Sequence, residues 1–229
     1  MRTVQDVLRH KKYFIFDLDG TLIDSRQNQL QGIWSIVKHY SPDKPINYQT
    51  ILDAFDKKID INRSTRYEIY TTMGLCCCEE SCKDVDLFYW EGVGSVFKWI
   101  ENAEQVLAGL KKEGKKLSIV TNGEEVQHKK INLIKETIDP KEIEFDYTIV
   151  TGDYGKERYK PNPYCLEKVI RSYETEKDQC VYIGDSIAND YEMAKSIGVD
   201  FILFDQKETN TDFEGFRISD LRELTCATI

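Results

Sequence analysis

The sequence predicts an α/β protein with a Rossmann-like three-layer core, in which helices cover a parallel sheet, and an all-helical domain inserted into that core. Three observations predict this fold class. Short apolar runs each end at polar or acidic residues, helical stretches alternate with these runs, and the long segment 24–99 interrupts the alternation. The length of 229 residues also lies between one and two domains of roughly 150 residues each.

The apolar runs predict buried strands, because short uninterrupted apolar stretches are typical of strands covered on both faces of a parallel sheet. The expected strands are at 13–18, 117–120, 147–150, 181–183 and 201–204. The carboxyl ends of parallel strands lie at one edge of the sheet, where ligands bind in folds of this class. We therefore expect the polar residues that end these runs to gather there.

Helical stretches separate the expected strands, at 103–112, 124–137, 163–172 and 187–197. Gly114 and Gly198 follow two of them, as is common just after a helix end. Alternation of strand and helix indicates a largely parallel sheet.

Segment 24–99 is far longer than the roughly two to six residues that usually join a strand to a helix. Its apolar residues follow helical spacing, as in Leu30, Ile33, Trp34 and Val37, in Ile51, Phe55 and Ile59, and around 85–99. We therefore expect a helical domain at 24–99 and an α/β core built from 1–23 and 100–229.

The composition excludes several classes of protein. Lys and Arg total 31 against 40 Asp and Glu, a net charge of −9, which disfavours binding to a nucleic-acid backbone. No stretch approaches the roughly 18 apolar residues that span a bilayer, so no membrane association is expected. The first twelve residues contain no apolar signal region, and we expect a cytoplasmic protein. No pattern predicts the oligomeric state.

Four of the seven cysteines crowd together, at Cys76, Cys77, Cys78 and Cys82. No histidine or second cysteine pair stands at zinc-finger spacing. We interpret these residues as reduced, structural thiols.

Asp17 and Asp19 end the first expected strand, and Gly20 follows them. Residues i and i+2 of an extended chain point the same way, so both carboxylates can face one reaction centre. Two adjacent carboxylates repel each other unless a cation lies between them, which indicates a metal site or an acid/base pair. A solvated strand end before a turn is the alternative.

Other polar residues follow the later strands. Asp185 and Asp190 lie at the end of the fourth strand and the start of the next helix, where a helix cap is the simpler interpretation. Thr121 and Asn122 follow the second strand, and Lys160 precedes a proline. Their order along the chain is more informative than any one of them.

Taken together, these elements resemble the four signature motifs of the haloacid dehalogenase (HAD) superfamily of phosphohydrolases. The first motif is matched by DLDGTL at 17–22, and the others by Thr121, by Lys160, and by Asp185 with Asp190. The helical insert lies where subfamily I members carry their cap domain. The stretch 121–129 is similar to phosphoglycolate phosphatase-like and nucleotidase-like members.

The resemblance implies a Mg²⁺-dependent phosphatase of a small phosphorylated metabolite. It implies that Asp17 attacks phosphorus to form an aspartyl-phosphate and that Asp19 acts as acid and then as base. The implied Mg²⁺ ligands are Asp17, the backbone carbonyl of Asp19, and Asp185. Asp190 would orient Lys160 or a metal-bound water from behind. Phosphate binding is implied for Thr121, the amide of Asn122 and Lys160.

Alternatives stay open within and beyond this family. A phosphosugar mutase would share these motifs, and a catalytically silent member would only bind a partner. Dehalogenating members lack the second aspartate, so Asp19 favours phosphate chemistry. Lys156 is a weaker candidate for the phosphate-binding lysine. In the helical segment Arg63, Arg66 and Tyr67 could meet a substrate but are more often solvated, and His39 and His128 are interpreted as surface residues.

Overall fold

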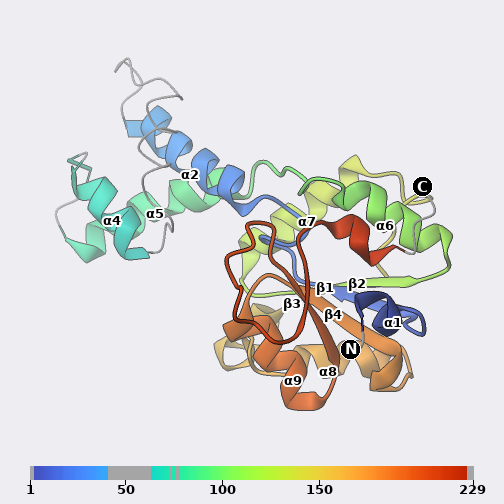
Figure 1. Ribbon diagram of the computed structural model, residues 1–229. Helices are drawn as coiled ribbons and strands as arrows, with labels where there is room; N and C mark the ends of the chain where they lie inside the picture. Colours follow the sequence, from blue (N-terminus) through green and yellow to red (C-terminus); the bar gives the residue numbers. More distant parts are fainter. Residues whose placement is uncertain (1–2, 41–62, 73, 76–77, 226–229) are drawn as a thin grey trace. The chain divides into compact units, whose positions relative to one another are not determined.

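The computed structural model of the protein describes residues 3–40, 63–72, 74–75 and 78–225 (Figure 1). The chain divides into two compact units. One contains Met1–Asp24, Trp99–His128 and Ile134–Ile229, and the other contains Ser25–Lys98 and Lys129–Leu133. The expected helical pattern around Ile51, Phe55 and Ile59 lies outside the described residues.

The first unit is built on a sheet whose strands, within the described residues, follow the order β3-β2-β1-β4-β5-β6, all parallel. The strands are β1 (Tyr13–Phe16), β2 (Lys116–Thr121), β3 (Tyr147–Val150), β4 (Cys180–Gly184), β5 (Asp200–Phe204) and β6 (Phe216–Ile218). β1 lies between β2 and β4, so the first, second and fourth expected strands end side by side. All five expected strands form, within one or two residues of their expected ends.

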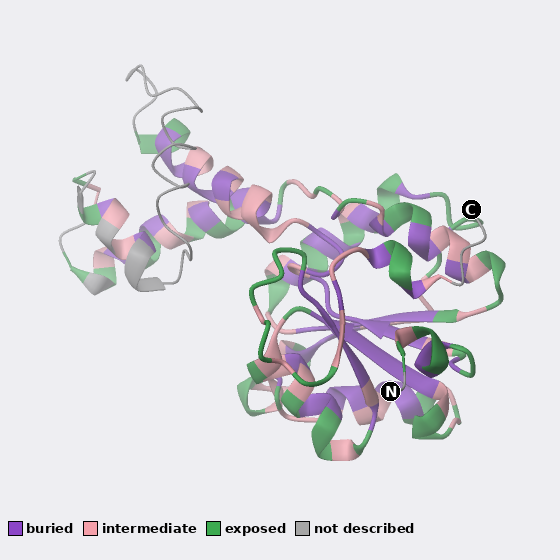
Figure 2. Ribbon diagram, viewed as in Figure 1, coloured by how far each residue is buried: buried purple, intermediate pink, exposed green. Residues whose placement is uncertain are grey.

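Helices of this unit are α1 (Val4–Leu8), α6 (Ala103–Lys112), α8 (Tyr164–Ser172) and α9 (Glu192–Ile197), together with both ends of α7 (Glu125–Thr137), whose middle residues Lys129–Leu133 belong to the other unit. α8 and α9 lie on one side of the sheet and α6 on the other (Figure 1). A buried cluster joins α8 and α9 to the strands, including Ile15, Val169, Tyr182 and Met193. Figure 2 shows the strands of the sheet as mostly buried. The predicted three-layer α/β core is thus confirmed.

Two elements of the first unit were not expected from the sequence, and one differs in form. β6 is a short edge strand and α1 a single turn and a half, both too short to give a periodic pattern. The helix expected at 187–197 begins as a π-helical turn, Ile187–Tyr191, before α9. This wider turn places Asp190 inward, where it is fully buried.

The described part of the second unit is helical, with α2 (Ser25–Tyr40), α4 (Arg63–Thr72) and α5 (Glu79–Val93). α2 packs along α5, and a Cβ at Gly32 would lie only 2.6 Å from the Tyr89 ring, so glycine allows this close approach. α5 ends at Val93, several residues before the end of the helical stretch expected around 85–99.

Arg66 of α4 is buried and bound in its own unit. Its guanidinium donates two hydrogen bonds of 2.9 Å to the Asp86 carboxylate, which also accepts one from the Tyr70 hydroxyl at 2.8 Å. It also lies over the rings of Tyr89 and Trp90, 4.7 and 4.8 Å from their centroids. The expectation of a solvated Arg66 is therefore wrong, since this side chain joins α4 to α5.

Cys82 is buried and disulfide-bonded, so the expectation of a reduced thiol is wrong at this position. Cys78 is an exposed thiol, and Cys76 and Cys77 lie outside the described residues. Helices that combine the length and apolar character needed to cross a membrane do not occur in the described parts of the chain.

Candidate active site

A tight turn after β1 carries the first two candidate carboxylates. The backbone N–H of Asp17 donates to the carbonyl of Ile183 at 2.9 Å, which continues the pairing of β1 with β4. The N–H groups of Leu22 and Ile23 then bond back to the carbonyl of Leu18, which folds 18–23 into a compact turn. Gly20 adopts φ +81° within it, a conformation that favours glycine.

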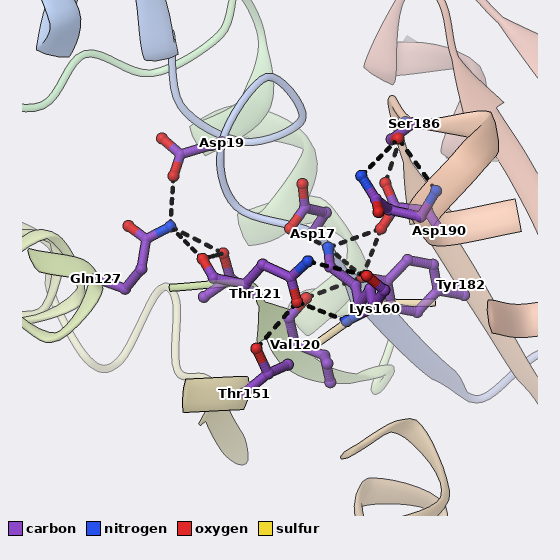
Figure 3. A network of polar contacts seen from close by, with 12 residues as sticks. Asp17, Asp19, Val120, Thr121, Gln127, Thr151, Lys160, Tyr182, Ser186 and Asp190 are labelled. Atoms are coloured by element: carbon purple, nitrogen blue, oxygen red, sulfur yellow. Dashed lines mark hydrogen bonds and ion pairs between the residues drawn. The ribbon is translucent and has the colours of Figure 1, made fainter. Parts of the chain in front are cut away.

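Lys160 joins two of the candidate carboxylates in the interior (Figure 3). Its Nζ lies 2.6 Å from Asp17 Oδ1 and 2.7 Å from Asp190 Oδ1, and all three side chains are at least nine-tenths buried. The Tyr182 hydroxyl is within hydrogen-bonding reach of both Lys160 Nζ and Asp190 Oδ1, at 3.3 and 3.2 Å. Burial would lower the pKa of Lys160, but the two carboxylates raise it above its ordinary value, so the lysine stays cationic.

Asp190 is held from both of its oxygens. Oδ1 contacts Lys160, and Oδ2 accepts a hydrogen bond of 3.1 Å from the backbone N–H of Ser186. A Cβ at Gly184 would lie 2.5 Å from the Asp190 Cγ, so glycine at the end of β4 makes room for this carboxylate. Because its carboxylate is fixed in this way, Asp190 is well placed to orient Lys160.

Asp17, Asp185 and Asp190 form a cluster whose carboxylate oxygens lie within 4.8 Å of one another. Burial raises the pKa of Asp17 to about 7; Lys160 opposes this, and the neighbouring charges of Asp190 and Asp185 add to it. Asp185 is exposed as a residue, but its carboxyl packs under Gly20, and lost hydration and the charge of Asp190 raise its pKa to about 6. The cluster therefore resists carrying its full negative charge without a further cation.

The donor set fits a hard divalent cation such as Mg²⁺, which takes oxygen ligands and needs few protein carboxylates. Asp17 and Asp185 of the expected ligand set belong to this cluster, together with Asp190, and the third expected ligand is the backbone carbonyl of Asp19. Both oxygens of Asp190 are already engaged, so Asp17 and Asp185 are the carboxylates best suited to hold the ion.

The Asp19 carboxylate points to a different partner. Its Oδ2 accepts a hydrogen bond of 2.6 Å from Nε2 of Gln127, near the start of α7 (Figure 3). The same Nε2 lies 3.2 Å from Thr121 Oγ1 and 2.9 Å from the carbonyl oxygen of Asn122. One amide thus ties the turn after β1 to the end of β2.

Asn122 uses its side chain to hold the backbone of Lys160. Its Oδ1 accepts hydrogen bonds from the Lys160 N–H at 2.7 Å and from the Thr151 hydroxyl at 2.9 Å. Its Nδ2 donates to the Lys160 carbonyl at 3.3 Å. The Asn122 side chain therefore positions Lys160, and only its backbone amide is a candidate for binding phosphate.

The structure brings together every residue that the sequence singled out for the site: Asp17, Asp19, Thr121, Asn122, Lys160, Asp185 and Asp190. Lys156 does not join them, because its side chain is 83% exposed and lies 3.4 Å from Glu124. His128 is exposed and contacts Asp153 at 2.8 Å, and His39 is exposed as expected.

Sequence reasoning gave no role to Gln127 or Tyr182, which both belong to this network. The Tyr182 hydroxyl donates a hydrogen bond of 2.9 Å to the Val120 carbonyl. A tyrosine within the apolar run of β4 was the available signal, because a buried tyrosine hydroxyl usually needs a hydrogen-bond partner. Gln127 leaves no such signal, since a glutamine in a mixed helix is ordinarily solvated.

Comparison with known proteins agrees with this geometry. The profile of haloacid dehalogenase-like hydrolases matches residues 14–204. The chain is 23% identical over 214 residues to a glyceraldehyde 3-phosphate phosphatase of Pyrococcus furiosus, covering 86% of this chain and 82% of that protein. It is 22% identical over 190 residues to a phosphoglycolate phosphatase of Aliivibrio fischeri, covering 82% and 81%.

Among solved structures, the HAD-hydrolase YfnB of Bacillus subtilis, solved with bound magnesium, is similar in fold. Its TM-score is 0.70 at 17% identity, and the match covers 94% of this chain and 97% of that one. The profile match spans most of the chain and includes the turn after β1, Lys160 and the Asp185–Asp190 loop. The chain belongs to the haloacid dehalogenase-like hydrolase family.

Proposed function

We propose that this protein is a Mg²⁺-dependent phosphomonoester hydrolase of a small phosphorylated metabolite, acting through an aspartyl-phosphate on Asp17. The observation that carries the proposal is the cluster of Asp17, Asp185 and Asp190 at the carboxyl ends of β1 and β4, in which Asp17 and Asp190 both contact Lys160. The names of relatives from Pyrococcus furiosus and Aliivibrio fischeri support this class of substrate.

The residues divide the reaction between them. A carboxylate oxygen of Asp17 bonds to phosphorus as the bond to the leaving oxygen breaks, and Asp19 gives that oxygen its proton. Asp19 then takes a proton from the water that attacks the aspartyl-phosphate, which releases inorganic phosphate and restores Asp17. Lys160, the Thr121 hydroxyl and the Asn122 amide bind the phosphoryl oxygens and offset their charge.

Asp17 and Asp185, with the backbone carbonyl of Asp19, would hold Mg²⁺. The ion supplies positive charge that keeps Asp17 ionised and offsets the charge of the phosphoryl group. Asp190 keeps Lys160 directed at Asp17, at the distances given above.

The proposal also assigns a role to the helical segment. Residues 24–99 would serve as the cap domain that selects the leaving group, while 1–23 and 100–229 carry the chemistry. The metabolite itself would then be set by residues of the cap.

A panel of phosphate monoesters, with inorganic pyrophosphate added, tests the proposal by measuring inorganic phosphate released in Mg²⁺. We expect release from at least one alkyl monoester, its loss when EDTA removes the metal, and its loss in Asp17→Asn. Retained activity in Asp17→Asn would contradict the mechanism. No release across the panel would instead favour a catalytically silent binding protein.

A phosphosugar mutase is the second candidate, because it would use the same carboxylates and return the phosphoryl group to a sugar. Product analysis separates the two functions. Free inorganic phosphate supports hydrolysis, and an isomerised sugar phosphate supports the mutase.

A further inference from the structure

Gln127 bridges two parts of the site that the proposed chemistry uses separately. Its Nε2 lies 2.6 Å from Asp19 Oδ2, 3.2 Å from Thr121 Oγ1 and 2.9 Å from the carbonyl oxygen of Asn122. Figure 3 shows the Gln127 amide directed at the Asp19 carboxylate, while Lys160 is directed at Asp17.

The orientation of this amide follows from its neighbours. Turning it over would place Oε1 against the Asp19 carboxylate and the Asn122 carbonyl, so oxygen would face oxygen at less than 3 Å. In the observed orientation Oε1 is buried and meets no hydrogen-bond partner within the described residues. An unsatisfied buried carbonyl is unfavourable, so the contacts of Nε2 decide the position of the side chain.

Neighbouring groups restrict the side chain further. The residue is only 7% exposed, and a Cβ at Gly123 would lie 2.5 Å from its Cγ. The aliphatic part of Gln127 thus packs directly on the Gly123 backbone. Because the Gln127 rotamer is fixed by this packing, its amide restricts the position of the Asp19 carboxylate that it binds.

We propose that Gln127 is a positioning residue that holds Asp19 in place as the acid that protonates the leaving group. This inference rests on the proposed phosphatase function. Because Gln127 acts on Asp19 and leaves the Asp17–Lys160 pair untouched, its loss impairs protonation of the leaving oxygen more than attack on phosphorus.

The dependence of rate on the leaving group tests this role. kcat/KM covers the steps up to formation of the aspartyl-phosphate, and an alkoxide needs a proton in those steps. A 2,4-dinitrophenolate leaves without one. A merely structural role for Gln127 would lower kcat/KM for both kinds of ester alike.

The experiment compares Gln127→Met with wild type on two substrates: the alkyl monoester that the wild type hydrolyses best and 2,4-dinitrophenyl phosphate. Methionine has the length of glutamine and donates no hydrogen bond. We expect kcat/KM to fall about tenfold or more further for the alkyl ester than for the aryl ester, with the roughly 10²–10⁴-fold contribution of general acid catalysis as the upper limit. Gln105→Met, at an exposed position of α6, is the matched control and should change neither value.

Equal losses on both substrates, in a variant that unfolds cooperatively like the wild type, would overturn the inference while leaving the phosphatase function intact. A wild type inactive on both substrates would instead refute the proposed function. The crystal structure of Gln127→Met gives a readout independent of turnover. An Asp19 carboxylate that keeps its position without Gln127 would overturn the positioning role, and a displaced one would support it.

Discussion

The Asp185 carboxylate lies so close to the Gly20 backbone that no side chain fits at position 20. A Cβ built at Gly20 would lie 2.9 Å from the Asp185 Cγ and would overlap its carboxylate. The turn after β1 therefore contacts the loop after β4 through the backbone of Gly20, which packs against the carboxylate of the candidate metal ligand Asp185.

Gly20→Ala should consequently lower both stability and Mg²⁺ affinity. The φ of +81° costs an L-residue roughly 1–2 kcal/mol, and displacement of Asp185 adds to that. Gly114→Ala is the matched control, since Gly114 has φ +76° and no atom within 4 Å of its would-be Cβ. Urea denaturation and calorimetric titration with Mg²⁺ measure the two effects. Equal loss of stability in both variants with unchanged Mg²⁺ affinity would show that the contact with Asp185 is unimportant.

Lys160→Met should destabilise the fold and abolish turnover. It leaves Asp17 and Asp190 buried side by side without their cation, and breaking a buried ion pair costs roughly 3–5 kcal/mol. Lys156→Met removes a lysine from the same segment whose side chain is exposed, and it should change the free energy of unfolding by no more than about 0.5 kcal/mol. If Lys156→Met abolished activity and Lys160→Met did not, the phosphate-binding lysine would be reassigned.

Arg66→Met should destabilise the helical unit by about 3 kcal/mol, because Asp86 would lose a buried partner that binds it through two nitrogens. Circular dichroism during urea unfolding follows this loss, with Lys83→Met on the exposed face of α5 as the control. A variant with unchanged stability and a raised KM would identify Arg66 as a substrate contact instead.

Asp205 should contribute stability that depends on pH. Its buried position would raise the pKa of its carboxyl, but hydrogen bonds from Asn210 and Thr209 lower it below its ordinary value. Because the folded-state pKa is the lower one, the contribution is fully present above the unfolded value of about 4 and is lost as pH falls through the folded one.

Asp205→Asn should therefore be less stable than wild type by roughly 1–3 kcal/mol at pH 7, with the difference shrinking in acid. Thermal unfolding between pH 7 and pH 3 measures it, and Asp212→Asn, exposed in the same loop, is the control. A difference between Asp205→Asn and wild type that stays constant over this pH range would show that the charge of Asp205 is not involved.

The sequence by itself determined the sheet and which polar residues end its strands. Strand β1 and its neighbours are apolar runs that can be buried only within a covered parallel sheet, and each delivers its polar end to the same edge. That is why Asp17 and Asp185 could be named from the sequence and the three-layer core was predicted correctly, whereas Lys160 was named through the family resemblance.

Only the tertiary structure decided which hydrogen-bond partner each buried polar side chain has. Gln127 and Arg66 carry no local pattern that separates a buried side chain from a solvated one, and their partners, Asp19 and Asp86, lie 108 and 20 residues away. The short strand β6 likewise forms only because β5 offers it a free edge. Local spacing specifies helices, strands and their polar ends, whereas hydrogen-bond partners distant in sequence are fixed only when the packed fold removes water from between them.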